Sequence, residues 1–520
     1  MMARFHPKRL AASIFVIVGL TSMYKFIILR PPLDIQPTQK LLLDTIKTTS
    51  LALDNSVHLK HSFEPRQTNQ TVTQHKQSAA VHVNKTETRN DRNFGLNPIK
   101  VHEDVHMDAI KVRFDSKTGL MSCPGLSKPQ NIPNDTQVFQ ELRKGDRLIF
   151  GFGAYYDVRR NLIRITAIQD AHTANRPKFC QLWKESSNDV TVTKMRIERN
   201  QGGHGNRYNG AFLTCPLQED GGVYSAVSIT FEECERAQNI FSIQYPQIDD
   251  ISDEPANDFN VCLEAPLNLN YSRYYELIEW IEMNRILGAS HFTIYNHTSS
   301  NLVKTVLESY IKDGIVTLVQ WPIPLRVHIW PQPKSYVEEI HYYGQTAMIN
   351  DCLYRMRHSA KYLVFVDLDE FIIPKKTQTW IEFIKENDPK RRMGGYVFRN
   401  VFFRKEWDSG SAISNDQTVQ KLKLVTLMKT KKETKIWPPY QRSKLIIDPL
   451  KIKEMGAHQI WGEKSGADLV VDPKDGLLHH YRNWENPSDL PGPVDETMLK
   501  YKDDLIDAVI KRYAKLGLNY

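Results

Sequence analysis

The residues best suited to chemistry are three carboxylates inside an otherwise apolar stretch, YLVFVDLDEFIIP, at residues 362–374. Asp367 and Asp369 are two positions apart, so in an extended chain they share a face while Leu368 points into the core. Converging carboxylates repel each other and are costly to desolvate, and a divalent cation relieves both costs. Hard oxygen ligands suit Mn²⁺ or Mg²⁺, ions that proteins often share with a substrate's phosphates. The pattern therefore predicts a metal site for a phosphate-bearing substrate, although an exposed acidic turn is the plainer alternative.

Two later segments offer partners for such a site. In LLHHYR, His479 and His480 point to opposite faces of a predicted strand, so only one imidazole can reach the ion. In YQRSKLIIDP, Arg442 and Lys444 share a face and could neutralise a diphosphate leaving group. The alternative for each pair is an ordinary surface position.

Further candidates concern the sugar and the proton. In EMGAHQIW, His458 and Trp461 are candidate substrate contacts, and an indole can stack on a sugar face, although a tryptophan is more often part of a core. Glu370 adjoins the metal site and is a candidate base, but strand alternation turns it away if Asp367 and Asp369 face the ion. Glu406 and Asp408, in the polar loop after YVFRNVFF, are its rivals.

The elements that must position these residues read as an α/β layer. Strand, helix and strand alternate, which is typical of parallel strands with helical crossovers. In such sheets ligands bind beyond the carboxyl ends of the strands, where Asp367 falls. The expected strands are 259–264, 291–298, 315–321 and 362–366, and the expected helices are 274–288, 301–314 and 341–358.

The first part of the chain predicts a membrane address. Residues 10–29 are apolar and long enough to cross a bilayer, which makes residues 1–9 a cytoplasmic tail; a cleavable signal peptide is the alternative. Residues 30–110 are polar and poor in aromatics, so we expect a flexible luminal stem. Acceptor sequences for N-glycans at Asn69, Asn84 and Asn134 agree with a luminal location.

Residues 111–250 contain short alternating runs separated by turn residues, which predicts a β-rich accessory domain before a domain at residues 255–520. The six cysteines allow fifteen pairings in an oxidising compartment, and the absence of a CxxC pair argues against zinc. The net charge of +8 is a mild excess that does not require nucleic acid. The basic segment 421–435 predicts a strand or hairpin with one solvated face.

Taken together, HYYGQTAMINDCLYRMRHSAKYLVFVDLDEFIIP, RSKLIIDPLKIKEMGAHQIW and LLHHYR resemble glycosyltransferase family 92, in the same order and spacing. The likeness covers residues 259–484, about half of the chain. Over residues 1–250 it extends only to the general layout and to a Cys180–Cys215 pair. The resemblance implies a GT-A type nucleotide-sugar transferase domain, with Asp367, Asp369 and His480 as metal ligands and His458 at the family's histidine.

The same resemblance implies an inverting, metal-dependent galactosyltransferase. Together with the apolar stretch at residues 10–29, it predicts a Golgi membrane protein with a single type II anchor, a luminal catalytic domain and Mn²⁺, or alternatively Mg²⁺, as its ion. Its donor is expected to be UDP-galactose, transferred in β-1,4 linkage to terminal β-galactose or to the core fucose of a glycoprotein N-glycan. Two alternatives remain open. One is a membrane-anchored glycan-binding protein that kept the fold without catalysis, and the other is a transferase that uses another UDP-hexose.

Overall fold

The computed structural model describes two structured regions of the chain. The predicted tail, anchor and stem, residues 1–110, lie outside the described residues, as do Asn69, Asn84 and Asn134. Among the described helices, none is both long and apolar enough to span a membrane. The described residues are 112–114, 121–130, 137–144, 147–172, 176–185, 190–217, 223–246, 257–329, 331–408, 411–483 and 490–520.

The first region is built from strands, as the alternating runs predict. Its eleven strands follow the order β1-β2-β7-β6-β10-β11-β4-β5-β9-β8, and β3 pairs with β4. All pairings are antiparallel except β11 with β4. The strands are β1 (Arg113–Phe114), β2 (Met121–Ser122), β3 (Gln140–Lys144), β4 (Arg147–Asp157), β5 (Leu162–Asp170), β6 (Phe179–Lys184), β7 (Val190–Lys194), β8 (Arg196–Arg199), β9 (Tyr208–Pro216), β10 (Tyr224–Thr230) and β11 (Phe241–Gln244).

Disulfides connect parts of this sheet that are not hydrogen-bonded neighbours. Cys180 on β6 is bonded to Cys215 on β9, although four strands, β10, β11, β4 and β5, lie between β6 and β9 in the strand order. Side chains from both halves of the sheet share one apolar core around that bond. The sheet therefore folds over on itself, and the Cys180–Cys215 pair suggested by the resemblance is confirmed. A second bond joins Cys123 to Cys234.

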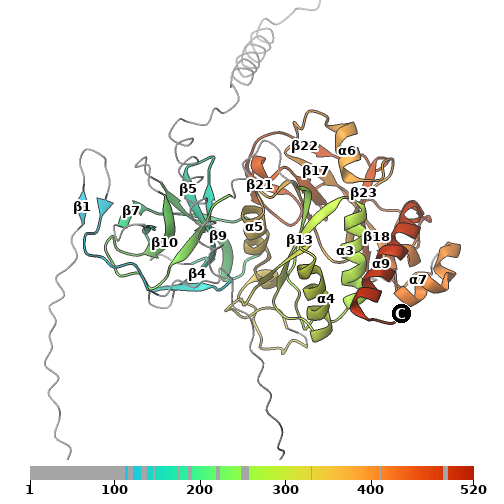
Figure 1. Ribbon diagram of the computed structural model, residues 1–520, viewed down its shortest axis with the longest axis horizontal. Coiled ribbons are helices and arrows are strands. Elements are labelled where there is room, and N and C mark those ends of the chain that lie inside the picture. Colours follow the sequence, from blue (N-terminus) through green and yellow to red (C-terminus); the bar gives the residue numbers. More distant parts are fainter. Residues whose placement is uncertain are drawn as a thin grey trace, which may run out of the picture.

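The second region is the predicted α/β layer. A seven-stranded sheet has the order β14-β13-β12-β15-β19-β17-β22, in which β14, β13, β12 and β15 are parallel. Helices α3 and α4 cover one face of the sheet in Figure 1, while α5 lies on the side of the first region. The strands are β12 (Asn257–Leu263), β13 (Ala289–Asn296), β14 (Val316–Gln320), β15 (Ala360–Val366), β17 (Gly395–Phe398), β19 (Lys444–Ile447) and β22 (Asp468–Val470); the helices are α3 (Tyr274–Ile286), α4 (Asn301–Lys312) and α5 (Gln345–Arg355).

Smaller sheets and helices surround this layer. One sheet has the order β16-β23-β18, and β20 pairs with β21. The prediction of a strand or hairpin at residues 421–435 is wrong, because most of its first half belongs to two short helices that break where Lys423 adopts a φ of 57°. The elements are β16 (Glu370–Pro374), β18 (Asn400–Arg404), β20 (Ile452–Met455), β21 (Ile460–Lys464), β23 (Gly476–Arg482), α6 (Trp380–Asn387), α7 (Gln417–Leu422), α8 (Val425–Met428), α9 (Lys502–Leu516), η2 (His341–Gly344), η3 (Ala412–Asn415), η4 (Pro449–Lys451) and η5 (Thr497–Tyr501).

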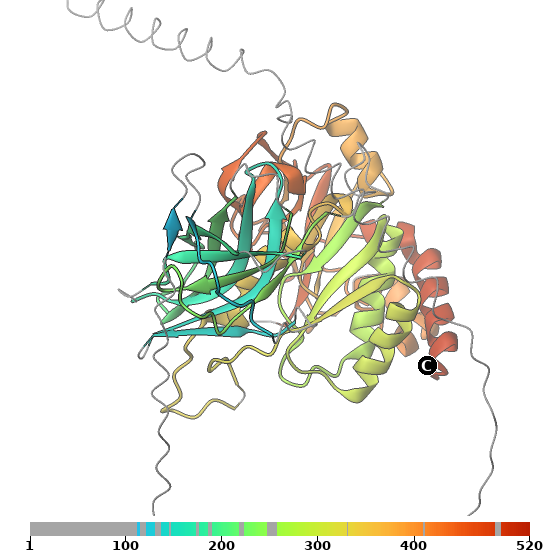
Figure 2. The ribbon, with the colours of Figure 1, turned by 60° about the vertical axis from the view of Figure 1, so that its left-hand side comes forward.

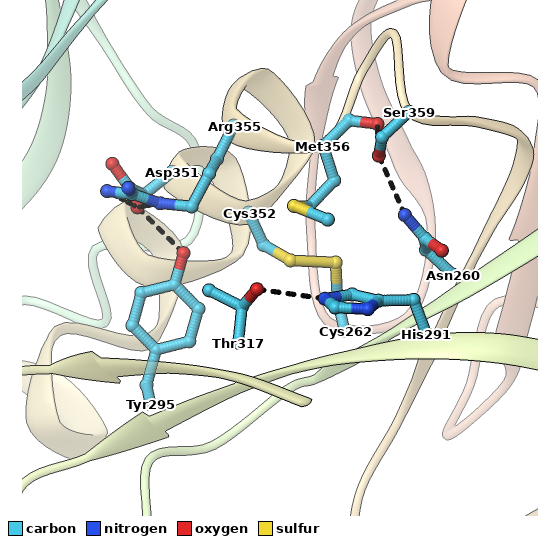
Figure 3. The surroundings of a disulfide bond; sticks show 10 residues. All are labelled: Asn260, Cys262, His291, Tyr295, Thr317, Asp351, Cys352, Arg355, Met356 and Ser359. Atoms are coloured by element: carbon cyan, nitrogen blue, oxygen red, sulfur yellow. Dashed lines mark hydrogen bonds and ion pairs between the residues drawn. A yellow bond between two sulfur atoms is a disulfide. The ribbon is translucent and has the colours of Figure 1, made fainter. Parts of the chain in front are cut away.

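Helix α5 joins the two regions, which lie side by side in Figures 1 and 2. Its Asp351 is fully buried and accepts hydrogen bonds from Tyr155 on β4 at 2.6 Å and from Thr166 on β5 at 2.9 Å. The same carboxylate accepts from Tyr295 on β13 at 2.7 Å and from Arg355 at 3.0 Å. Figure 3 shows Tyr295 pointing toward Asp351, next to the disulfide that fixes the following residue.

That disulfide joins Cys352 to Cys262 on β12 and so attaches α5 covalently to the central parallel strand. Asp351 contacts side chains of both regions, and Cys352 is bonded to the sheet. Adjacent residues on one helix therefore hold both regions, and α5 leads directly toward β15 and its acidic end.

We predict that replacing this buried carboxylate weakens the whole molecule. Asp351→Ala leaves the Arg355 guanidinium without its buried partner, so the free energy of unfolding should fall by about 3–5 kcal/mol. Chemical denaturation followed by intrinsic fluorescence measures this loss. The control Asp507→Ala removes an exposed carboxylate on α9 and should change stability little. Equal effects of the two variants would contradict the role given to Asp351.

Candidate active site

The acidic stretch forms a tight turn at the carboxyl end of β15. The Glu370 amide donates to the Asp367 carbonyl oxygen at 3.2 Å, and the Glu370 carboxylate accepts from the Asp367 amide at 3.0 Å. Leu368 packs against the core, as its position predicts. The side chains of Asp367 and Asp369 are 28% and 36% exposed. Two carboxylates therefore stand partly open to solvent at the edge where a parallel sheet binds its ligands.

A buried lysine holds this turn from the neighbouring strand. Lys444 is the first residue of β19, which runs antiparallel to β15. Its ammonium lies 2.9 Å from the Asp367 carboxylate and 3.1 Å from that of Glu370, and it also contacts the Glu264 carboxylate just after β12. The Lys444 and Glu264 side chains are 1% and 0% exposed. We call these four residues the Lys444 cluster.

The charges of the Lys444 cluster depend on one another. Burial alone would lower the pKa of Lys444, but Asp367, Glu264 and Glu370 raise it well above its ordinary value, so the ammonium stays charged. Burial raises the pKa of Glu264 well above its ordinary value, against the opposing effect of Lys444. Burial also raises the pKa of Glu370, against Lys444 and His480. Three acids thus share one buried cation, and the cluster has acid in excess.

A histidine lies beside the second aspartate of the turn. Strand β23 pairs with β16 so that His480 faces Glu370. The Nε2 atom of His480 lies 3.5 Å from Asp369, and its Nδ1 atom lies 3.1 Å from Glu370 and 3.2 Å from the Asn400 side-chain oxygen. Burial alone would lower the pKa of His480, but Glu370 and Asp369 raise it. Burial alone would raise the pKa of Asp369, but His480 and nearby basic groups lower it.

These donors suit a manganese ion. Asp369 supplies a carboxylate and His480 an imidazole, and Asp367 keeps one oxygen, Oδ1, buried and without a hydrogen-bond partner among the described residues. Within the described ranges, no group of three or more His, Cys, Asp or Glu is arranged to hold a metal ion by itself. An ion bound here would therefore need further ligands from water or substrate phosphates, as is common for such ions.

The two basic residues of YQRSKLIIDP have different surroundings. Lys444 is buried among carboxylates, whereas Arg442 lies over two aromatic rings, 4.9 Å from the centre of Trp437 and 5.5 Å from that of Phe402. The Phe402 ring centre is 4.8 Å from that of His480, so Arg442 and His480 flank the same ring. Arg482 lies over the same Phe402 ring, 5.7 Å from its centre, so two guanidinium groups lie near the ring that His480 contacts, and a guanidinium binds phosphate oxygens in pairs.

The remaining candidates take other positions. His458 lies 3.2 Å from the Ser443 carbonyl oxygen, and burial, assisted by Lys444, lowers its pKa to about 4, which leaves the imidazole neutral. Trp461 fills space over Gly202 and Gly456, where any side chain would overlap its indole. Its ring therefore packs the second region against the first. Glu406 is exposed in the turn after β18.

Of the two histidines, one faces the site as strand alternation predicts. His479 is fully buried on the opposite face, and its ring centre is 4.5 Å from that of Phe403. Sequence reasoning missed Glu264 and Asn400. A signal for Glu264 was present, because it follows the strand that pairs with β15 and the carboxyl ends of parallel strands meet at one edge. No comparable signal marks Asn400.

Comparison with known proteins adds a family. Residues 257–515 match glycosyltransferase family 92. One Caenorhabditis elegans relative is β-1,4-galactosyltransferase galt-1, which is 24% identical over 49% of this chain and 58% of its own length. Another is glycosyltransferase family 92 protein C33H5.2 of the same organism, which is 26% identical over 29% of this chain and 31% of its own length. The chain thus spans about three fifths and one third of their lengths. A structure of UDP-glucose pyrophosphorylase complexed with UDP-glucose aligns at 10% identity and a TM-score of 0.19, over 50% of this chain and 99% of its own, and supports no argument about the fold.

We predict that the Lys444 cluster fails when its cation is removed. Lys444→Met leaves buried carboxylates uncompensated, so the free energy of unfolding should fall by about 3–5 kcal/mol in chemical denaturation. Adding Glu264→Gln removes one of the excess acids and should restore part of the loss, which a double-mutant cycle measures. The control Lys474→Met replaces an exposed lysine and should have little effect. Strictly additive losses at positions 444 and 264 would contradict the coupling.

Proposed function

Because the chain belongs to glycosyltransferase family 92 through its domain at residues 257–515, we propose that it is a Mn²⁺-dependent galactosyltransferase. It transfers galactose from UDP-galactose in β-1,4 linkage, with inversion, to terminal β-galactose or core fucose of a glycoprotein N-glycan. A GT-A type fold is part of this proposal, supported by the parallel order β14-β13-β12-β15 and an acidic turn after β15. The similarity to a protein described as a β-1,4-galactosyltransferase supports the donor and the linkage.

The observation that carries the proposal is the contact between Asp369 and His480 beside Asp367, at the carboxyl end of β15. Asp369 and His480 would hold the ion, with Asp367 as the neighbouring carboxylate. Mn²⁺ would neutralise negative charge on the diphosphate as the glycosidic bond breaks. Asn400 and Glu370 orient the imidazole through its other nitrogen, and such outer contacts tune metal ligands.

The basic residues Arg442 and Lys444 have different roles in this proposal. Arg442, over Trp437 and Phe402, binds the diphosphate oxygens and stabilises the charge of the departing UDP. The sequence pattern predicts that Lys444 binds the diphosphate, but this buried lysine on β19 instead holds the Asp367 carboxylate in place. His458 stays neutral near Lys444 and is a hydrogen-bond donor or acceptor for the substrate, and Trp461 is a second candidate contact.

The acceptor hydroxyl must lose a proton to a base. Glu370 is 1% exposed and engaged by Lys444 and His480, which suits it to positioning those groups. Glu406, exposed to solvent after β18, is the other candidate base. In-line attack by the deprotonated hydroxyl inverts the anomeric carbon.

A Golgi membrane location with a luminal catalytic domain completes the proposal. The apolar stretch at residues 10–29 supports a type II anchor. Disulfides pair all six cysteines, which agrees with an oxidising compartment. The use of UDP-glucose or another UDP-hexose, and a glycan-binding protein without catalysis, are distinct outcomes of the test below.

We predict that Asp369→Asn abolishes metal-linked nucleotide binding. Turnover should fall by at least 100-fold, because losing even an outer contact of a metal ligand costs about 10–100-fold. The assay incubates the full chain with a panel of UDP-sugars and a glycan array, with Mn²⁺ or with EDTA, and calorimetry measures UDP affinity. Wild-type transfer should occur with UDP-galactose and Mn²⁺ only.

The control Asp507→Asn, on the exposed face of α9, should retain activity and UDP affinity. Retained turnover in Asp369→Asn would contradict the metal role of this residue. Glycan binding without turnover or UDP binding in the wild-type chain would favour the non-catalytic alternative.

A further inference from the structure

A second site lies at the same edge of the parallel sheet. A groove of about 790 Å³ opens between the loop after β13, helix α4 and the edge strand β14. Grooves of this size accommodate ligands of several rings. Its walls include Asn296 at the end of β13, Ser299 in the following loop, and Gln320 at the end of β14. None of these residues belongs to the acidic turn or to the Lys444 cluster.

Two buried side chains of this groove have unmet hydrogen-bonding capacity. Asn296 and Ser299 are each only 7% exposed. The Asn296 amide nitrogen donates to the Gln320 side-chain oxygen at 3.1 Å, but its oxygen Oδ1 has no partner among the described residues. The Ser299 hydroxyl likewise has none within the described part of the chain. Buried polar groups are normally paired, so these two atoms indicate a missing polar partner.

The lining identifies the chemistry of that partner. Lys304 and Glu308 lie one turn apart on the exposed side of α4 and bring one charge of each sign. Amides and hydroxyls supply both donors and acceptors, while Leu318 gives a small apolar surface. A phosphate would require several cations, so the balanced charge favours a neutral ligand with many hydroxyl groups. Sugars combine such hydroxyls with apolar C–H faces.

The location connects this groove to the transfer site. Asn296 ends β13 and Asp367 follows β15, and in the order β13-β12-β15 these positions are two strand spacings apart, roughly 10 Å. The backbone of the intervening loops is also joined, because Tyr271 pairs with Ser299. A chain of two or three sugars can span such a distance.

We propose that the groove beside Asn296 and Ser299 binds inner sugar residues of the acceptor glycan while its terminal sugar lies near Asp369. This inference rests on the proposed function for the identity of the glycan as an acceptor. The groove determines which glycans are used, because a monosaccharide acceptor is too short to reach both sites.

The test uses the full chain and exposed positions, so that folding is preserved. The double variant Glu308→Ala/Gln320→Ala removes two polar groups of the groove. The control Thr305→Ala/Lys312→Ala changes two exposed positions of α4 that do not line it. Probes are a galactose-terminated N-glycan, methyl β-galactoside as the one-sugar acceptor, and UDP with Mn²⁺; calorimetry and initial rates measure Kd and KM.

The groove variant should raise Kd and KM for the N-glycan by about tenfold or more, as expected for two lost hydrogen bonds. KM for methyl β-galactoside and Kd for UDP should stay unchanged, and the control should match the wild type. Unchanged N-glycan affinity would overturn the proposal, and so would an equal loss for the monosaccharide or a loss of UDP affinity. If no UDP-sugar is turned over, a selective loss of glycan binding still supports the groove and only the transferase proposal fails.

Discussion

The arrangement of this site depends on one buried ammonium. Lys444 reaches from β19 to carboxylates that follow β12 and β15, so three neighbouring strands converge on a single charge. In a low-dielectric interior, each carboxylate is costly without its partner and the ammonium is costly without the carboxylates. The order of the three strands therefore brings the carboxylates of the acidic turn to the one buried ammonium at the edge of the sheet.

Glu370 links the buried Lys444 ammonium to His480, which faces the exposed side of the site. One of its oxygens contacts Lys444 and the other contacts His480, whose Nε2 atom faces Asp369. The imidazole is thus positioned through a buried chain of charges. Asp367 contacts Lys444 and Asp369 contacts His480, and these two aspartates are the partly exposed members of the series of charged side chains. Such fixed outer contacts are what keep ligand groups oriented before a cation or diphosphate arrives.

Alternation and strand order account for how much of this could be predicted from sequence. The parallel layer, the place of Asp367 at a strand end and the expectation that only one of His479 and His480 faces the site follow from these rules alone. The choice of His480 rests on the family resemblance. How deeply each side chain is buried does not follow from alternation or strand order. Lys444 and Arg442 share a predicted face, yet only coordinates distinguish a lysine buried under three acids from an arginine over Trp437. The prediction of a strand or hairpin at residues 421–435 failed for a related reason, since lysines that alternate with apolar residues fit a strand and also fit short amphipathic helices.

The separation of Lys444 from Arg442 has a chemical logic. A lysine used both to neutralise Glu264 and Glu370 and to bind a diphosphate would lose its carboxylate partners whenever substrate bound, which would expose the turn to repulsion between its own acids. Placing the permanent cation inside and a guanidinium outside, next to the Phe402 ring that His480 also contacts, separates holding the site from binding the ligand. The interior can then stay fixed while the outer charges respond to whatever anion enters.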